Sequence, residues 1–318
     1  MYAAVVRSFD KPPVYDRFDD PLPAEGEQLV HVSAAALHQI VRSLANGTHY
    51  GSSGQLPIVA GVDGTGRLAD GTRVYFGAVR APFGTMAELA PASSRMMVPL
   101  PDGLDETHAA AMANPAMSSW VALEARAKFV PGESVLVLGA NGVSGRLSLQ
   151  IAKRLGAGHV AAAARNPDVE LLKSLGADSV IDLGLPQEQL VAALKNHLAE
   201  TGADIVLDYL WGQPAERVLE AIAQRGLGHA APRIRYVQIG SIAGQQIPLH
   251  AATLRSSGLE LLGSGFGSAS LPEILRAIGN FFEAAVQQPF QMEMKVASLR
   301  DVESLWNTPG EGRLVFQP

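Results

Sequence analysis

A strand, a glycine-rich turn, a helix and a second strand follow one another within residues 134–166, and no other part of the chain constrains the fold as strongly. The segment Val135–Leu138 is apolar on both faces, which is typical of a strand buried in a parallel sheet. This strand ends at Gly139, and further glycines follow at Gly142 and Gly145. The order predicts a strand that leads into a tight turn.

A helix is predicted directly after the third glycine. Leu147, Ile151 and Leu155 recur every four residues, and Gly156 marks the end of the pattern. The first amide groups of such a helix bind anions, and a turn of this kind is typical of dinucleotide-binding sites. We expect the cofactor contacts here to be Gly139, Ala140, Asn141, Gly142, Val143 and Ser144. An ordinary strand-to-helix turn is the alternative, in which Asn141 only tolerates a left-handed backbone.

The second strand, His159–Ala164, indicates which dinucleotide is bound. An Asp or Glu after this strand would accept hydrogen bonds from a ribose 2′-hydroxyl, but this chain has Arg165 and Asn166 instead. A guanidinium offers a planar fork of donors to the oxygens of a 2′-phosphate. The pattern favours NADP(H) over NAD(H), with a solvated surface arginine as the alternative.

Composition narrows the classes of function. The chain has 318 residues, a formal net charge of −6 and no cysteine. This length predicts two domains, and the charge makes neither nucleic acid nor an anionic membrane an expected partner. The lack of cysteine excludes disulfides and thiolate ligands. The first residues, 1–6, are typical of a strand rather than of a leader, and no apolar stretch is long enough to span a bilayer, so we expect a cytoplasmic protein.

The pattern of predicted strands and helices changes near residue 118. Before it, short β-type segments at 3–6, 29–32, 66–68, 74–76 and 85–90 predict a small irregular barrel. After it, strands at 135–138, 160–164, 180–183, 205–209, 236–239 and 259–262 alternate with helices at 187–198 and 215–223, which predicts a doubly wound sheet of six parallel strands. A helix at 272–285 and strands at 292–296 and 313–316 return the chain to the first domain. We therefore predict an α/β protein with one domain at 1–117 and 267–318 and a Rossmann domain at 118–266.

Several motifs occur in an order that resembles the medium-chain dehydrogenase/reductase superfamily, specifically its zinc-independent quinone oxidoreductase branch. They are the segments at 60–66, 113–120, 130–133, 135–145, 175–178 and 312–315, and they cover nearly the whole chain. The resemblance implies a GroES-like barrel as the catalytic domain beside the Rossmann domain. It also implies a homodimer, paired through the edge of the nucleotide-domain sheet.

The resemblance also bears on metal and on catalytic residues. Zinc-dependent members have a cysteine where this chain has His38, and a Gly-His-Glu where it has Gly61–Asp63, so no metal is expected. The quinone oxidoreductase pattern has an Asn at the His38 position and an Asp where this chain has Val41. His38 either orients a substrate carbonyl or donates a proton, or it is a buried histidine of the barrel. Tyr50 lies where relatives have an active-site tyrosine, and it either polarises a carbonyl or packs.

The resemblance implies further cofactor contacts at the carboxyl ends of the strands and in the motif before the nucleotide domain. They are Asn114, Ser118, Leu210, Gly240, Ser241, Ile242, Gly265 and Phe266. For Gly240 and Gly265 the alternative is a plain loop glycine.

The implied chemistry is delivery of a hydride from NADPH to an electron-poor carbon. Quinones and α,β-unsaturated carbonyls suit it best, because conjugation spreads the developing charge and reduces the need for a Lewis acid such as zinc. A nucleotide-binding redox sensor or structural protein with little turnover is the second hypothesis. An alcohol or carbonyl dehydrogenase is the third.

Overall fold

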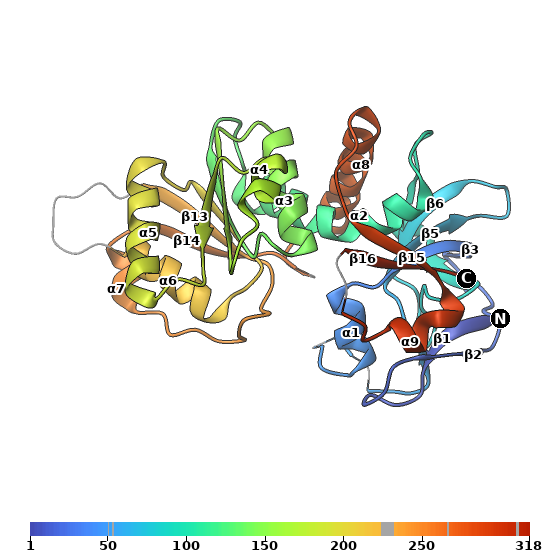
Figure 1. Cartoon of the computed structure of the whole chain (residues 1–318). Helices are drawn as coiled ribbons and strands as arrows, with labels where there is room; N and C mark the ends of the chain where they lie inside the picture. Colours follow the sequence, from blue (N-terminus) through green and yellow to red (C-terminus); the bar gives the residue numbers. More distant parts are fainter. Residues whose placement is uncertain (50, 53, 224–231, 266, 310–311) are drawn as a thin grey trace. The chain divides into compact units, whose positions relative to one another are not determined.

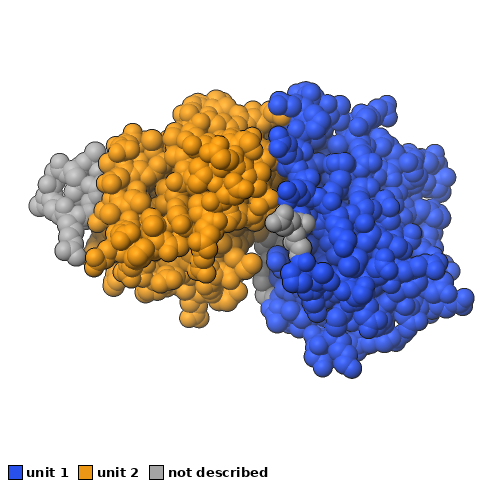
Figure 2. Space-filling model, viewed as in Figure 1, with its two compact units in different colours: residues 1–114, 278–318 blue, residues 115–277 orange. Residues whose placement is uncertain are grey.

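The computed structural model describes residues 1–49, 51–52, 54–223, 232–265, 267–309 and 312–318 (Figure 1). The chain forms two compact units, which Figure 2 distinguishes by colour. The first unit contains Met1–Asn114 and Ile278–Pro318, and the second contains Pro115–Ala277. Within the described residues, no helix is both long and apolar enough to cross a membrane.

The second unit is built on a six-stranded parallel sheet with the order β11-β10-β9-β12-β13-β14. Its strands are β9 (Ser134–Leu138), β10 (His159–Ala164), β11 (Ser179–Asp182), β12 (Ile205–Asp208), β13 (Arg233–Gln238) and β14 (Gly258–Gly263). The chain moves outward from β9 to β11, then returns to the other side of β9 with β12, so the switch point lies between β9 and β12. The predicted doubly wound sheet is confirmed.

Helices cover both faces of this sheet. The helical segments of this unit are the π-helix η2 (Val121–Ala127), α3 (Val143–Arg154), α4 (Val169–Ser174), α5 (Gln187–Glu200), α6 (Gly212–Ile222) and α7 (Ala251–Arg255), together with the end of α2 (Glu106–Trp120) and the start of α8 (Leu271–Gln287). Leu136 and Leu138 of β9 pack in one core with residues of α5 and α6. Because side chains alternate along a strand, Val135 and Val137 face the opposite side, where α3 lies (Figure 1).

The first unit contains mainly antiparallel sheets. One sheet has the order β2-β1-β4, and a seven-stranded sheet runs β15-β16-β3-β5-β6-β8 with β7 paired to β3. The strands are β1 (Tyr2–Val6), β2 (Val14–Arg17), β3 (Glu27–Ala36), β4 (Ile58–Val59), β5 (Asp63–Arg67), β6 (Arg73–Gly77), β7 (Leu89–Ser93), β8 (Met97–Pro99), β15 (Met294–Ser298) and β16 (Arg313–Gln317). The helices are α1 (Gln39–Ala45), α9 (Val302–Leu305) and the short 3₁₀ turns η1 (Ser94–Met96) and η3 (Leu299–Asp301).

The end of the chain, Ile278–Pro318, belongs to this unit. Val315 of β16 pairs with Ala36 of β3, and β15 lies parallel beside β16. The mixed α/β fold class inferred from the sequence is therefore confirmed.

One predicted strand of the first unit is misplaced. The sequence pattern at 85–90 predicted a strand there, but β7 begins only at Leu89. The Thr85 hydroxyl donates to the Asp63 carbonyl at 2.8 Å, and Ala87 forms only an isolated bridge with Ala3. Residues 86 and 88 also share backbone hydrogen bonds with neighbouring segments, such as the one from the Met86 amide to the Ala60 carbonyl at 2.9 Å, but residues 85–88 lie outside a regular strand. Strands β2, β4 and β8 were not predicted, since they are short and lack a clear apolar alternation.

Candidate functional site

The glycine-rich turn joins the end of β9 to the start of α3. Gly139 has a φ of +90°, which favours glycine, and its amide donates to the Ala163 carbonyl of β10 at 2.9 Å. A Cβ atom on Gly145 would lie 2.2 Å from the Gly139 carbonyl oxygen. Only glycine at position 145 therefore lets α3 pack this closely on the turn.

The first turn of α3 is open to a ligand. Gly142 is its N-cap residue, and no side chain caps the helix in the described structure. Gly142 is exposed, and a Cβ atom there would meet only the Gly139 oxygen, at 3.4 Å. Uncapped amides beside a glycine fit the pyrophosphate of a dinucleotide, because the helix end attracts anions and the backbone is accessible.

The Arg165–Asn166 dipeptide directly follows β10. The side-chain amide of Asn141 donates to the Arg165 carbonyl at 2.8 Å, and the Asn166 amide donates to Asp182 Oδ1 at 3.0 Å. Asn166 has a φ of +46°, in the left-handed region. The Arg165 side chain is exposed, and its guanidinium forms no hydrogen bond or ion pair with the described part of the chain. An unpaired cation is thus presented at the carboxyl edge of the sheet.

The other predicted contacts of the second unit follow β12, β13 and β14. The Leu210 side chain lies over the turn, so that a Cβ atom on Gly139 would be 3.1 Å from Leu210 Cδ2. Gly240 packs against the backbone of Tyr209, where a Cβ atom would lie 2.6 Å from the carbonyl oxygen. Gly240 is therefore required by close packing rather than being a plain loop glycine.

After Gly240, Ser241 is partly exposed and Ile242 is 71% exposed. Gly265 is exposed with open space around it, and its amide donates to the Ser268 hydroxyl at 2.7 Å. Phe266 lies outside the described residues. The parallel topology thus brings the predicted residues from Gly139 to Gly265 to one edge of the sheet.

A cluster of hydroxyl groups lies beside the turn. The Tyr209 hydroxyl contacts the hydroxyls of Ser118, Ser119 and Ser148 at 3.3, 3.0 and 2.8 Å. Burial raises the pKa of Tyr209. Ser148 also donates to the Ser144 carbonyl in the first turn of α3 at 2.7 Å. The cluster therefore fixes the predicted contact Ser118 to the start of α3. Asn114 lies one helical turn before Ser118 on the same face of α2 and is partly exposed.

Asp208 holds the loop that follows β12. Its Oδ1 accepts hydrogen bonds from the amides of Leu210 and Trp211 at 2.7 and 3.0 Å, and its Oδ2 accepts one from the Tyr236 hydroxyl at 2.7 Å. Burial raises the pKa of Asp208. Trp211 has a φ of +54°, unusual for a bulky residue, and this strain is sustained by the hydrogen bonds to Asp208.

His38 belongs to the first unit and immediately precedes α1. It is 3% exposed, and its Nε2 lies 3.4 Å from Asp63 Oδ1. Neither ring nitrogen has hydrogen-bond geometry with any group of the described chain. Burial lowers the pKa of His38, although the Asp63 carboxylate opposes this effect, so the imidazole is neutral near pH 7. The other predicted catalytic residue, Tyr50, lies outside the described residues.

Asp63 is the centre of a buried polar group around His38. The Tyr75 hydroxyl donates to Asp63 Oδ2 at 2.6 Å. Burial lowers the pKa of Arg313 to about 10, and the Asp63 carboxylate works against this shift. Arg313 donates to the Leu37 carbonyl at 2.8 Å, directly before His38. Arg313 thus holds the segment that presents His38, and the Asp63 carboxylate lies beside the ring.

Two further features bear on where a ligand could bind. Within the described residues, no group of three or more His, Cys, Asp or Glu side chains is placed to hold a metal ion.

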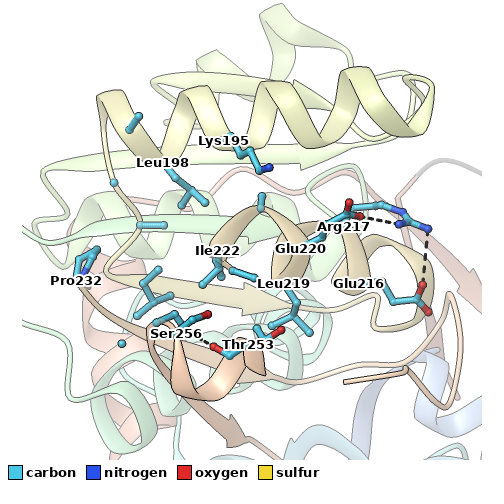
Figure 3. Close-up of a pocket in the computed structure, with 18 of the residues that line it drawn as sticks. Lys195, Leu198, Glu216, Arg217, Leu219, Glu220, Ile222, Pro232, Thr253 and Ser256 are labelled. Carbon is cyan, nitrogen blue, oxygen red and sulfur yellow. Dashed lines mark hydrogen bonds and ion pairs between the residues drawn. The ribbon is translucent and has the colours of Figure 1, made fainter. Parts of the chain in front are cut away.

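A cavity of about 980 Å³ in the second unit is lined by residues of α5, α6 and α7 (Figure 3). It also contacts Ser134, Ile234 and Gly258, which lie at the amino ends of β9, β13 and β14. It therefore lies at the edge of the sheet opposite the glycine-rich turn.

A parallel sheet with this turn, joined in one chain to an antiparallel catalytic sheet, defines a nucleotide-dependent oxidoreductase of the medium-chain type. The chain belongs to the medium-chain dehydrogenase/reductase superfamily and to its quinone oxidoreductase branch. The family model described as zinc-binding dehydrogenase matches residues 145–280. This match lies almost entirely in the second unit.

Among curated relatives, the chain is 30% identical to a probable NADPH-dependent quinone reductase of Emericella nidulans, over the whole of both chains. It is 34% identical to the 2-methylene-furan-3-one reductase of Solanum lycopersicum, over 50% of this chain and 45% of that protein. The quinone oxidoreductase of Thermus thermophilus, solved also with NADPH, is 25% identical with a TM-score of 0.80 over the whole of both chains. A mycobacterial quinone oxidoreductase with a TM-score of 0.85 is 20% identical over the whole of both chains and shows the likeness of fold alone.

Three residues at the carboxyl edge of the parallel sheet were not predicted as functional. Asp182 and Asp208 end their strands, and Tyr209 follows β12 directly. The available signal was their position, because polar residues that end buried parallel strands gather at the ligand edge. Their contacts depend on which strands are neighbours, which sequence spacing does not reveal.

Proposed function

We propose that this protein is an NADPH-dependent reductase that delivers hydride to a quinone or an α,β-unsaturated carbonyl without zinc. The observation that carries the proposal is the exposed, unpaired Arg165 guanidinium at the end of β10, at the same edge as the uncapped start of α3 in the described structure. The names of the relatives from Emericella nidulans and Solanum lycopersicum agree with it.

Each loop at the carboxyl edge of the parallel sheet has a role in this proposal. The amides at Gly142–Ser144 bind the pyrophosphate, and Arg165 binds the 2′-phosphate of the adenosine half. Ser118, fixed by the Tyr209 cluster, and Asn114 bind near the nicotinamide ribose. When bound, NADPH supplies a hydride from C4 of its nicotinamide. The loops that begin at Leu210, Gly240 and Gly265 cover the dinucleotide and keep water from it.

The domain of residues 1–117 and 267–318 provides the side chains that contact the substrate. His38 is buried and neutral, so it serves as a hydrogen-bond donor to the substrate oxygen rather than as a strong acid. The Asp63 carboxylate lies 3.4 Å from His38 Nε2, and the proton that completes reduction comes from water. Tyr50 is the second proposed group that polarises the carbonyl. A cytoplasmic location completes the proposal.

Single-turnover kinetics test this function. The protein is saturated with NADPH and mixed in a stopped-flow instrument with 1,4-benzoquinone or 9,10-phenanthrenequinone. We expect the absorbance of the reduced nicotinamide to fall on mixing, with NADH as the weaker donor. Binding without oxidation would favour the redox sensor or structural protein instead. Reduction of NADP⁺ by simple alcohols would favour a dehydrogenase.

A further inference from the structure

Asp182 is placed where it can act on the proposed cofactor arginine. It is the last residue of β11, and in the parallel pairing of β10 with β11 it lies opposite Ala164, the last residue of β10. Arg165 follows Ala164 directly. The carboxylate is half-buried at the carboxyl edge of the sheet.

One oxygen of Asp182 fastens two separate loops. Oδ1 accepts hydrogen bonds from the amides of Asn166 and Gly184, at 3.0 and 2.7 Å. Asn166 has left-handed backbone geometry, with a φ of +46°, which an L-residue adopts at some cost. The hydrogen bond from its amide to Asp182 offsets that cost and fixes the direction in which the chain leaves β10.

Arg165 is held from its other side as well. The Asn141 side chain, in the glycine-rich turn, donates to the Arg165 carbonyl at 2.8 Å. The peptide unit between Arg165 and Asn166 is thus fixed both to the glycine-rich turn and to the end of β11. Its aliphatic stem lies close to Gly184, where a Cβ atom would be 3.4 Å from Arg165 Cγ. The exposed guanidinium is left unpaired in the described part of the chain.

We propose that Asp182, together with Asn141, positions Arg165 and thereby sets the preference for NADPH over NADH. This inference rests on the proposed function. Asp182 is a positioning residue, since it acts through the shape of the Arg165–Asn166 turn. Its negative charge would repel a 2′-phosphate, so the geometry of its acceptor oxygen, and not its charge, accounts for its role.

A second role for Asp182 is distinguishable from this one. A carboxylate near an adenosine ribose accepts hydrogen bonds from the 2′-hydroxyl in NAD-dependent enzymes. In this structure the Oδ1 oxygen is already occupied by two backbone amides, which favours the positioning role. The two roles give opposite results when the charge is removed but the acceptor is kept, as in Asp182→Asn.

The experiment measures the dissociation constants of NADPH and NADH for the full-length protein by fluorescence titration. Asp182→Ala removes the acceptor, and we expect NADPH to bind about three- to tenfold more weakly while NADH changes less than about twofold. Asp182→Asn keeps the acceptor, and it should restore NADPH binding to that of the wild type or tighter. Asn141→Ala removes the second contact and should act in the same direction as Asp182→Ala.

Asp178 supplies the matched control, because it precedes the same strand at the opposite edge. It accepts a hydrogen bond from the Val160 amide at 2.7 Å and pairs with Lys153. Asp178→Ala should leave the ratio of the two dissociation constants unchanged. In an Arg165→Ala background, Asp182→Ala should no longer alter that ratio, because the residue through which it acts is absent.

Several results would overturn the inference. Equal weakening of both coenzymes by Asp182→Ala would show a merely structural role, and loss of NADH binding in Asp182→Asn would show that the carboxylate binds the ribose. A change of the ratio that persists without Arg165 would exclude action through this arginine. These outcomes all require a wild type that prefers NADPH, whereas a wild type that binds neither coenzyme contradicts the proposed function itself.

Discussion

At the scale of single residues, burial determines the chemistry of His38, and exposure determines that of Arg165. His38 is enclosed beside Asp63, whereas the Arg165 guanidinium is exposed and has no partner in the described structure. The sequence could suggest both residues from their positions in motifs. It could not give the lowered pKa of His38, because that depends on burial in the folded chain and on Asp63 and Arg313, which come from two different strands.

The buried histidine makes stability depend on pH. Burial lowers the pKa of His38 in the folded state, so the unfolded chain takes up the proton first as the pH falls below 6.5. The free energy of unfolding should therefore be fully present above pH 6.5 and decrease as the pH falls toward the lowered folded-state value. His197, whose pKa burial also lowers, adds to the same trend.

Urea titrations of the wild type and of His38→Asn, from pH 7.5 to pH 5, measure this effect. The variant should lose less stability than the wild type over that range, because only His197 and weaker contributions are left. The same pH dependence in both proteins would show that His38 is not the group responsible.

At the scale of elements, the sequence predicts an element correctly where the contacts of that element join residues close together in the chain. The β9–turn–α3 unit was predicted because its strand, glycines and helix are contiguous in the chain. Asp182 was missed because its partner Asn166 becomes a neighbour only through the pairing of β10 with β11. The strand expected at 85–90 begins only at Leu89, because residues 85–88 pair irregularly with segments that are distant in the chain.

Two glycines of this element allow packing and binding to be separated. Gly145→Ala should reduce the free energy of unfolding by about 1–3 kcal/mol and weaken both coenzymes, because the new Cβ would press on the Gly139 carbonyl. Gly142→Ala should leave stability unchanged but still weaken both coenzymes, because the new Cβ would enter the space in which we propose that the pyrophosphate binds. Thermal melts and titrations with NADPH measure the two effects. Wild-type affinity in Gly142→Ala would place the pyrophosphate elsewhere.

At the scale of the whole molecule, the order of motifs identified the two kinds of sheet and the return of the chain end to the first unit. The domain boundaries at 117 and 267 stay a prediction, since α2 and α8 each run from one compact unit into the other. The shape of the substrate-binding site cannot be predicted from the sequence, because it depends on side chains from segments that are distant in the chain.

The proposed homodimer is tested at the same scale. β14 is an edge strand, and its Leu261 is 38% exposed, so we propose that two copies pair there. Light scattering coupled to size exclusion should give the mass of two chains for the wild type and of one chain for Leu261→Asp. A wild type with the mass of one chain would contradict this pairing.

The central claim is that this chain binds NADPH and that Arg165 contacts its 2′-phosphate. Isothermal titration calorimetry of the wild type and of Arg165→Ala with NADPH and NADH tests this claim most directly. We expect one NADPH to bind per chain, more tightly than NADH. Arg165→Ala should bind NADPH roughly ten- to hundredfold more weakly and NADH nearly as the wild type does, because one charge-assisted contact with the 2′-phosphate is lost. No heat with either coenzyme, or equal losses for both in the variant, would contradict the account.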